Sequence, residues 1–161
     1  MQRSHEFPDQ DALSRLMTRD NVALGVVLEL LNSGRPNRAI YINNSHIHWN
    51  PSYSDVKLMQ TQLLMEDCEA MMQSRSSRFQ GIPMILCGDF NSTPNSAVYG
   101  FLRDGKLRPD HPEFLGFQYG RYSTPPNGGL RHPFKLASAY AAAGGEPPFS
   151  NFTHEFKGMR C

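Results

Sequence analysis

Apolar runs separated by a polar turn predict two strands in the first part of the chain. Residues 21–31, NVALGVVLELL, are mostly branched and apolar, which favours a buried strand over a short helix. The turn-rich stretch NSGRPN separates them from a second apolar run at residues 39–43. Two apolar runs joined by a short polar turn predict an antiparallel hairpin.

Residues 54–74 carry the clearest helical pattern, because no glycine or proline interrupts them. Ser54 is a candidate N-cap, and the negative charge of Asp55 suits the first turn of a helix. The apolar residues recur at helical spacing, which predicts a helix pressed against a sheet. The predicted stripe consists of Val56, Met59, Leu63 and Ala70, widened by Leu58, Met65, Cys68 and Met72.

The remaining elements are shorter. Residues 11–17 predict a helical turn, residues 84–87 a central strand, and residues 96–104 a helix capped by Asn95 or Ser96 and ended by Gly105. Residues 136–143 fit a short helix or strand, and residues 151–156 a strand. The order strand, helix, strand, helix predicts a layered α/β fold. We divide the chain into a polar N-terminal segment, 1–20, and a domain, 21–161.

Composition and charge limit the class of protein. A chain of 161 residues has the length of one domain, and 39% apolar residues suffice for a packed core. The net charge of +1 argues against a large basic face for nucleic acid. RNA stays open as a substrate, because a deep site can use a metal and a few cations instead.

The three cysteines, Cys68, Cys87 and Cys161, show no metal-binding spacing and leave one thiol over in any disulfide scheme. This pattern, without a secretory leader, predicts a reducing compartment. The longest apolar run, residues 22–31, is too short to span a membrane. We therefore expect a soluble intracellular protein that does not bind membranes.

Two polar segments follow apolar strands and are candidates for chemistry. Gly88 ends the strand at residues 84–87, and Asp89 and Asn91 follow two residues apart, so that in an extended chain both side chains point the same way. A carboxylate and a carboxamide could then hold a cation, water or phosphate at a strand end. The alternative is an Asx turn that closes the strand, and the pattern alone favours it.

The second segment is NSHIHWNP, residues 44–51, which follows the strand at residues 39–43. His46 and His48 would share one face of an extended chain, and either could donate to a phosphate or act as acid or base. A two-histidine metal site would need a third ligand, which the sequence does not indicate. Trp49 and Pro51 could stack on a base or simply pack in the core.

Together these segments resemble the endonuclease/exonuclease/phosphatase superfamily, and more narrowly the catalytic deadenylase subunit of the carbon catabolite repressor–NOT complex. The segments HIHWNPSYSDVKLMQTQ (46–62) and IPMILCGDFNS (82–92) carry the resemblance, with further similarity at 16–30 and 151–158. It implies a partial α/β fold of this superfamily, a layered sandwich of mixed β-sheets flanked by helices. The segment Trp49-Asn50-Pro51 before YSDVKL argues for this branch over the nocturnin-like and angel-like branches.

The resemblance also implies catalytic roles. Asp89 matches the aspartate that orients or deprotonates the attacking water. Asn91 matches the asparagine that holds this water and the scissile phosphate. His46 matches the histidine that donates to the phosphate, and His48 supports it from behind. The implied reaction is Mg²⁺-assisted hydrolysis that releases AMP from the 3′ end of poly(A).

Substrate-binding roles follow in the same way. Pro51 and Phe156 match the proline and phenylalanine that sandwich an adenine, and Asn44 belongs to the implied substrate-binding residues. The implied partners are poly(A) RNA 3′ ends and a multi-subunit deadenylase complex. The implied location is the cytoplasm, with the nucleus as a second one.

The chain departs from the family pattern at several points. The family's magnesium-binding glutamate lies in an N-terminal half without counterpart here, so we assign no metal ligand within this chain. The C-terminal Ser-Asp-His of the family is missing, Cys161 stands where an aspartate is expected, and Asn50 replaces the usual aspartate. We therefore expect a partial nuclease domain with little or no activity alone.

Two other readings stay open. A catalytically inactive, truncated relative could bind RNA or protein weakly through Pro51, Phe156, Lys57 and Lys157. A sibling phosphoesterase would act on a phosphoinositide or abasic DNA, although residues 49–51 argue against it. A substrate panel would separate the latter from a deadenylase.

Overall fold

The computed structural model describes residues 11–31, 39–74, 81–124, 128–147 and 150, and the description below is limited to them. The elements run in the order α1 Ala12–Met17, β1 Val22–Glu29, β2 Ala39–His46, the 3-10 helix η1 Pro51–Tyr53, α2 Ser54–Ser74, β3 Met84–Asp89, α3 Ala97–Asp104, β4 Lys106–Leu107, the 3-10 helices η3 Pro112–Phe114 and η4 Gly120–Tyr122, β5 Leu130–Arg131 and α4 Ala139–Ala142. The layered α/β class is confirmed, with mixed sheets and flanking helices.

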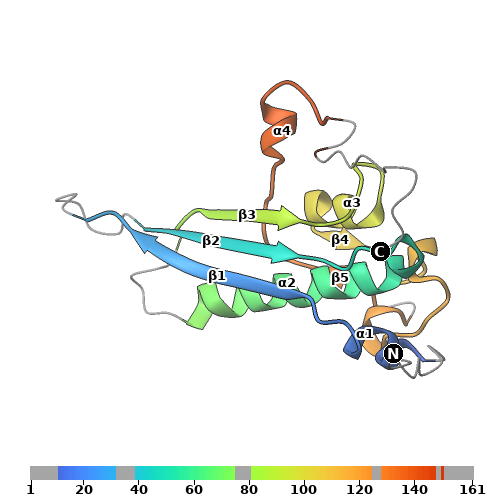
Figure 1. Cartoon of the computed structure of the whole chain (residues 1–161). Helices are drawn as coiled ribbons and strands as arrows, with labels where there is room; N and C mark the ends of the chain where they lie inside the picture. Colours follow the sequence, from blue (N-terminus) through green and yellow to red (C-terminus); the bar gives the residue numbers. More distant parts are fainter. Residues whose placement is uncertain (1–10, 32–38, 75–80, 125–127, 148–149, 151–161) are drawn as a thin grey trace, which may run out of the picture.

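The main sheet has the strand order β1-β2-β3 (Figure 1). Strands β1 and β2 form the predicted antiparallel hairpin, and β3 lies parallel to β2 after the crossover through α2. The strand predicted at residues 84–87 is therefore confirmed, but within the described residues β3 is an edge strand and β2 is the central one. Strand β2 is longer than predicted, because it continues to His46.

Helix α2 lies along one face of this sheet, with its first turns near the ends of β2 and β3 (Figure 1). Its side chains Leu58, Met65 and Cys68 are fully buried together with Tyr41 of β2. Gly25 of β1 lies beneath the Tyr41 ring, where a Cβ would meet the phenol oxygen. The absence of a side chain at residue 25 thus lets Tyr41 fill the space between sheet and helix.

The opposite face of the sheet is open. Alternate residues of β1 and one of β3 present large apolar side chains there that are between 37% and 73% exposed: Val22, Leu24, Val26, Leu28 and Ile85. The strand register places Asn44 and His46 of β2 on this face as well. We call these residues, with Cys87 and Asp89 of β3, the open face. Nothing in the described part of the chain covers it.

The start of α2 differs from its prediction. Asn50, not Ser54, caps the turn, because its side chain accepts from the backbone N–H of Ser52 at the start of η1. The Ser54 hydroxyl instead donates to the carbonyl oxygen of Glu113, at 2.9 Å. The predicted apolar stripe was also partly wrong, since Leu63 and Ala70 are exposed.

Helix α1, at residues 12–17, packs against the start of α2. Asp11 caps it by accepting from the N–H of Ser14. Arg15 is buried and makes two bonds to the fully buried carboxylate of Asp55 in α2, at 2.8 and 2.9 Å. The Tyr119 hydroxyl donates to the same carboxylate at 2.7 Å. Asp55 thus has three hydrogen bonds that offset the cost of burying its charge.

Two further helices agree with the sequence. Ser96 caps α3 through the N–H of Tyr99, and Gly105 ends it with φ +69°. Helix α4 lies within the predicted 136–143 segment. The strand predicted at residues 151–156 falls outside the described residues. Among the helices that the structure describes, none has the length and apolar character needed to cross a membrane.

Gly88 offers a sharp test of the β2–β3 packing. It has φ +128°, and a Cβ there would overlap the backbone of its register partner Ser45. We expect Gly88→Ala to lower the free energy of unfolding by about 1–3 kcal/mol. Gly100→Ala, in α3 where a Cβ meets nothing, should instead stabilise the chain by up to about 1 kcal/mol. Urea unfolding of the two variants measures both values, and equal midpoints would contradict the described strand contact.

Candidate active site

His46 and Asp89 lie side by side at the ends of two parallel strands. Each is the last residue of its strand, and the two are register partners across β2 and β3. Parallel neighbours of this kind are separated by about 4.8 Å between strands. Both side chains are exposed on the open face, so an imidazole and a carboxylate emerge next to each other there.

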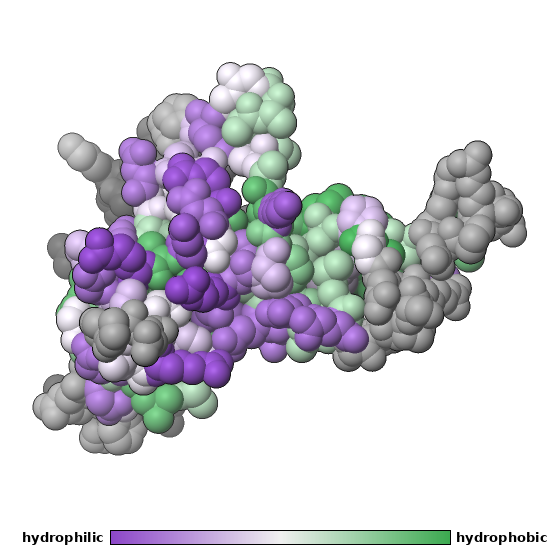
Figure 2. Space-filling view, turned by 180° about the vertical axis from the view of Figure 1, so that it is seen from behind, coloured by the Kyte–Doolittle hydropathy of each residue, from purple (hydrophilic) through white to green (hydrophobic). Residues whose placement is uncertain are grey.

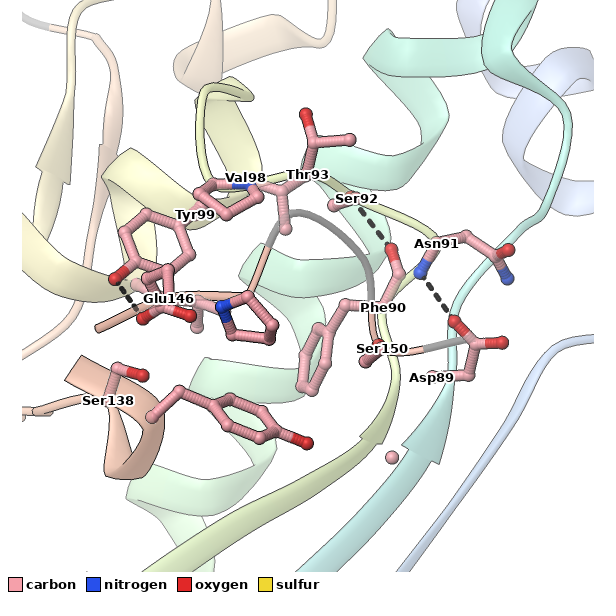
Figure 3. Close-up of a pocket in the computed structure, with 15 residues that line it drawn as sticks. Asp89, Phe90, Asn91, Ser92, Thr93, Val98, Tyr99, Ser138, Glu146 and Ser150 are labelled. Carbon is pink, nitrogen blue, oxygen red and sulfur yellow. Dashed lines mark hydrogen bonds between the residues drawn. The ribbon is translucent and has the colours of Figure 1, made fainter. Parts of the chain in front are cut away.

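The chain turns immediately after β3. Asn91 has a positive φ of 45°, and its backbone N–H donates to Oδ1 of Asp89 at 2.8 Å (Figure 3). This is the Asx turn that the Asp-x-Asn pattern alone favoured. The extended backbone predicted for residues 89–91 is wrong, because the chain leaves the strand before Asn91.

The turn nevertheless keeps Asn91 at the site. Its side-chain Nδ2 donates to the carbonyl oxygen of Ile47 at 2.9 Å, and the N–H of Ile47 donates to the carbonyl oxygen of Asp89 at 2.9 Å. These two bonds continue the connection between β2 and β3 beyond the sheet. Asp89, Asn91 and the residue after His46 are therefore fixed relative to one another.

Lys57 of α2 binds the backbone of this turn. Its side chain is buried at 8% exposure, and Nζ donates to the carbonyl oxygen of Asn91 at 2.7 Å. Burial lowers the pKa of Lys57, while the nearby Glu113 and Asp89 charges act in the opposite direction. The bond joins the first turns of α2 to the Asp89–Asn91 turn.

The two histidines occupy different environments, contrary to the prediction that they share a face. His46 is exposed, whereas His48 is buried at 9% exposure with its ring edge-on to Tyr53, 5.1 Å between centroids. Burial lowers the pKa of His48, and the positive charges of Arg19 and Lys57 lower it further. The ring of His48 therefore favours its neutral form, and it packs against Tyr53.

The implied substrate-binding residues are partly visible. Asn44 is exposed on β2, two residues before His46 and on the same face, with its Oδ1 3.8 Å from Sγ of Cys87. Pro51 is exposed as the first residue of η1. Phe156 lies outside the described residues, so the structure describes only Pro51 of the two residues predicted to stack on adenine.

A pocket of about 640 Å³ lies beside the Asp89–Asn91 turn, between β3, α3 and the α4 region. The ring of Phe90 and the carboxylate of Asp89 lie on opposite sides of the chain (Figure 3). On the far wall, the Tyr99 hydroxyl donates to Oε1 of Glu146 at 2.5 Å, which ties α3 to the chain after α4. Asp89 thus stands at the rim of this pocket.

A second hollow, of about 660 Å³, is lined by polar residues around β4 and β5. Figure 2 shows hydrophilic residues gathered on its left side, the side of the molecule that carries β4 and β5. Its charges are partly paired, as between Arg108 and Asp110. None of the residues predicted for catalysis lines it.

The described residues do not by themselves form a magnesium site. No group of three histidine, cysteine, aspartate or glutamate side chains converges anywhere in the described ranges. Asp89 offers a carboxylate, but Mg²⁺ demands a near-octahedral shell of oxygen ligands. A metal here would need ligands from beyond these residues.

Sequence reasoning missed Asn21 and Gln60 as supporting residues. It named Lys57 only as a possible contact to RNA, whereas Lys57 is buried and binds the backbone of Asn91. The signal was available at Lys57, since a lysine between Val56 and Leu58 in a buried stretch of helix calls for a specific partner. The partners themselves, backbone groups of residues 46, 48 and 91, are not readable from spacing.

Comparison with family models finds no match. Among characterised proteins, the chain is 37% identical over 176 aligned positions to the CCR4-Not complex 3′-5′-exoribonuclease subunit Ccr4 of Mycosarcoma maydis, covering 98% of the chain. It is 32% identical over 173 positions to the CCR4-NOT transcription complex subunit 6-like of Danio rerio, covering 91% of the chain.

The chain spans only 25% and 31% of the length of these two relatives. Among solved structures, it is similar to ANGEL2, a 2′,3′-cyclic phosphatase crystallised with adenosine-2′,3′-vanadate. The TM-score is 0.61 at 27% identity, over 78% of this chain and 43% of that one. The likeness thus extends along most of the chain but over less than half of the solved domain.

The lowered pKa of His48 predicts a pH dependence of stability. The unfolded imidazole has the ordinary pKa of 6.5, and the folded one binds its proton only at lower pH. As pH falls below the unfolded value, the unfolded chain takes up more protons, so stability is lost with acid. We expect the free energy of unfolding in urea to fall between pH 7.5 and 5.5, and to fall less in His48→Gln. An identical pH slope in the variant would contradict this assignment.

Proposed function

This chain is part of a Ccr4-like nuclease domain, and we propose that it supplies His46, Asp89 and Asn91 to the active site of a 3′-5′ poly(A) exoribonuclease. The observation that carries the proposal is the pairing of His46 with Asp89 at adjacent strand ends on one exposed face. A proton donor and a carboxylate at this spacing can contact one phosphodiester and the water that attacks it.

The local contacts support a role for each group. Asp89 uses Oδ1 for the N–H of Asn91, which fixes the carboxylate while it orients or deprotonates the water. Asn91 donates through Nδ2 to the carbonyl oxygen of Ile47, which leaves its Oδ1 to accept a hydrogen bond from the attacking water. His46 is exposed and donates to a non-bridging phosphate oxygen. His48, buried and neutral, stays outside the chemistry.

We propose that the open face is covered by the part of the nuclease domain that this chain does not span. His46 and Asp89 lie on the same face as the exposed Leu24 and Val26, so whatever covers the apolar side chains also closes the site. An apolar face of this kind is costly to leave in water. The relatives are three to four times longer than the chain, which leaves ample polypeptide for a covering layer.

The same covering layer would bring the missing carboxylate for Mg²⁺. When bound, the ion would neutralise charge on the phosphate oxygens and help position the water. Asp89 is the group in this chain best placed to face it. It follows that the 161-residue chain alone should have little or no nuclease activity.

The proposed preference for adenine rests on Pro51, whose exposed ring stands at the end of the loop after His46. An apolar clamp of Pro51 with Phe156 would reward the large π-face of adenine. Both Ccr4-type relatives are named as subunits of the CCR4-Not complex, and we propose that this chain acts within such a complex.

The competing activity is that of ANGEL2, named as a 2′,3′-cyclic phosphatase. Both reactions involve a phosphate ester next to a ribose, so the described residues could serve either. A substrate panel therefore has to include a 2′,3′-cyclic end beside oligo(A), oligo(U) and a phosphoinositide.

We expect the native-length protein carrying this chain to shorten oligo(A) from its 3′ end with Mg²⁺, faster than it degrades oligo(U). Asp89→Asn keeps the acceptor for the Asn91 N–H but removes the charge, so it should lower the rate by roughly a hundredfold or more. Gel analysis of labelled oligonucleotides measures this. Hydrolysis of the cyclic end with oligo(A) left intact would instead favour the phosphatase.

Two exposed leucines test how the open face is covered. Leu24 lies on the open face, and Leu63 lies on the solvent side of α2. In the native-length protein, we expect Leu24→Lys to lower both melting temperature and nuclease activity, because a charge would be buried between two layers. Leu63→Lys should leave both unchanged. Equal, small effects of the two substitutions would show that the open face faces solvent.

A further inference from the structure

Two polar side chains in the first turns of α2 form hydrogen bonds with the loops that follow β2 and β3. Lys57 and Gln60, three residues apart, lie on the same side of the helix. Lys57 binds the carbonyl oxygen of Asn91 beyond β3. Gln60 binds the N–H of His48 beyond β2, with Oε1 accepting at 2.9 Å.

Gln60 also makes a second bond, toward the start of β1. Its Nε2 donates to Oδ1 of Asn21 at 2.9 Å, and Nδ2 of Asn21 donates to the carbonyl oxygen of His46 at 2.9 Å. Each of the two side-chain amides thus donates one hydrogen bond and accepts one. The two side chains bracket the backbone on either side of Ile47.

The backbone of residues 46–48 is therefore bound from two sides. Asn21 and Gln60 bind it at His46 and His48, and the Asp89–Asn91 turn binds it at both polar groups of Ile47. These four hydrogen bonds involve three consecutive residues, so the backbone that follows the Cα of His46 has little freedom to rotate. The ring itself is exposed, so this backbone fixes the Cα–Cβ bond from which the imidazole extends.

We propose that Asn21 and Gln60 form a positioning pair that aims His46 at the substrate phosphate, and that their effect on the reaction is exerted through His46. This rests on the proposed nuclease function. Neither residue reaches the open face where the reaction would occur. A misplacement of about 1 Å in a group of this kind can cost a hundredfold in rate.

The chain offers a matched control on the same helix. Gln62 is buried and also binds backbone, because its side chain accepts from the N–H and donates to the carbonyl oxygen of Arg131, at 3.0 and 3.1 Å. It thus has the same side chain and a similar number of bonds as Gln60. Its target, β5, carries none of the candidate catalytic residues.

The test is a double-mutant cycle in the native-length protein, with oligo(A) and Mg²⁺ as the assay. We expect Gln60→Ala to lower kcat roughly 10- to 100-fold, but less than about 2-fold when His46→Ala is already present. Gln62→Ala should lower kcat by one and the same factor with and without His46→Ala. Melting curves confirm that each variant is folded at the assay temperature.

Equal factors for Gln60→Ala in both backgrounds would overturn the proposal, because a purely structural loss does not depend on His46. If Gln60→Ala fails to fold, Gln60→Glu keeps the acceptor for the His48 N–H and replaces the donor to Asn21 by a charged carboxylate oxygen, and the same cycle applies to it. Absence of any turnover by the unmodified protein would instead refute the proposed nuclease function.

Discussion

Helix α2 is the element on which both the core and the candidate site depend. Its buried side chains pack on one face of the sheet, and its polar side chains near the N-terminal end bind the loops that carry the candidate residues. Asp55 anchors this end through Arg15, and loss of one partner of such a buried pair typically costs about 3–5 kcal/mol. Strand register sets the separation of His46 and Asp89, and the same helix fixes the loops that follow them.

The two faces of the sheet have different roles. The face under α2 is closed and built around Tyr41, whereas the open face combines exposed apolar side chains with the candidate catalytic groups. A domain that gathers its reactive groups on an apolar face needs a second layer to exclude water from them. Under the proposed function, the open face would link stability to function, since the proposed covering layer would bury Leu24 and also complete the site.

The sequence predicted most of the framework because its signals were local. Uninterrupted periodicity gave α2, a polar turn between apolar runs gave the β1–β2 hairpin, and Ser96 with Gly105 gave the ends of α3. It failed where the decisive contact is distant. The Ser54 hydroxyl binds Glu113 instead of capping, and the turn at Asn91 depends on Lys57 and on the backbone of Ile47. The roles of His46, Asp89 and Asn91 came from family resemblance, and they stay predictions; their placement together is what the structure adds.

The most direct measurement is a crystal structure of the native-length protein with Mg²⁺ and an oligo(A) whose scissile phosphate resists hydrolysis. We expect the scissile phosphate between the imidazole of His46 and the Asp89–Asn91 turn, with the apolar side chains of the open face buried by a second layer. A phosphate bound elsewhere, or a fully covered His46 with Asp89 turned away from the metal, would contradict the proposed site.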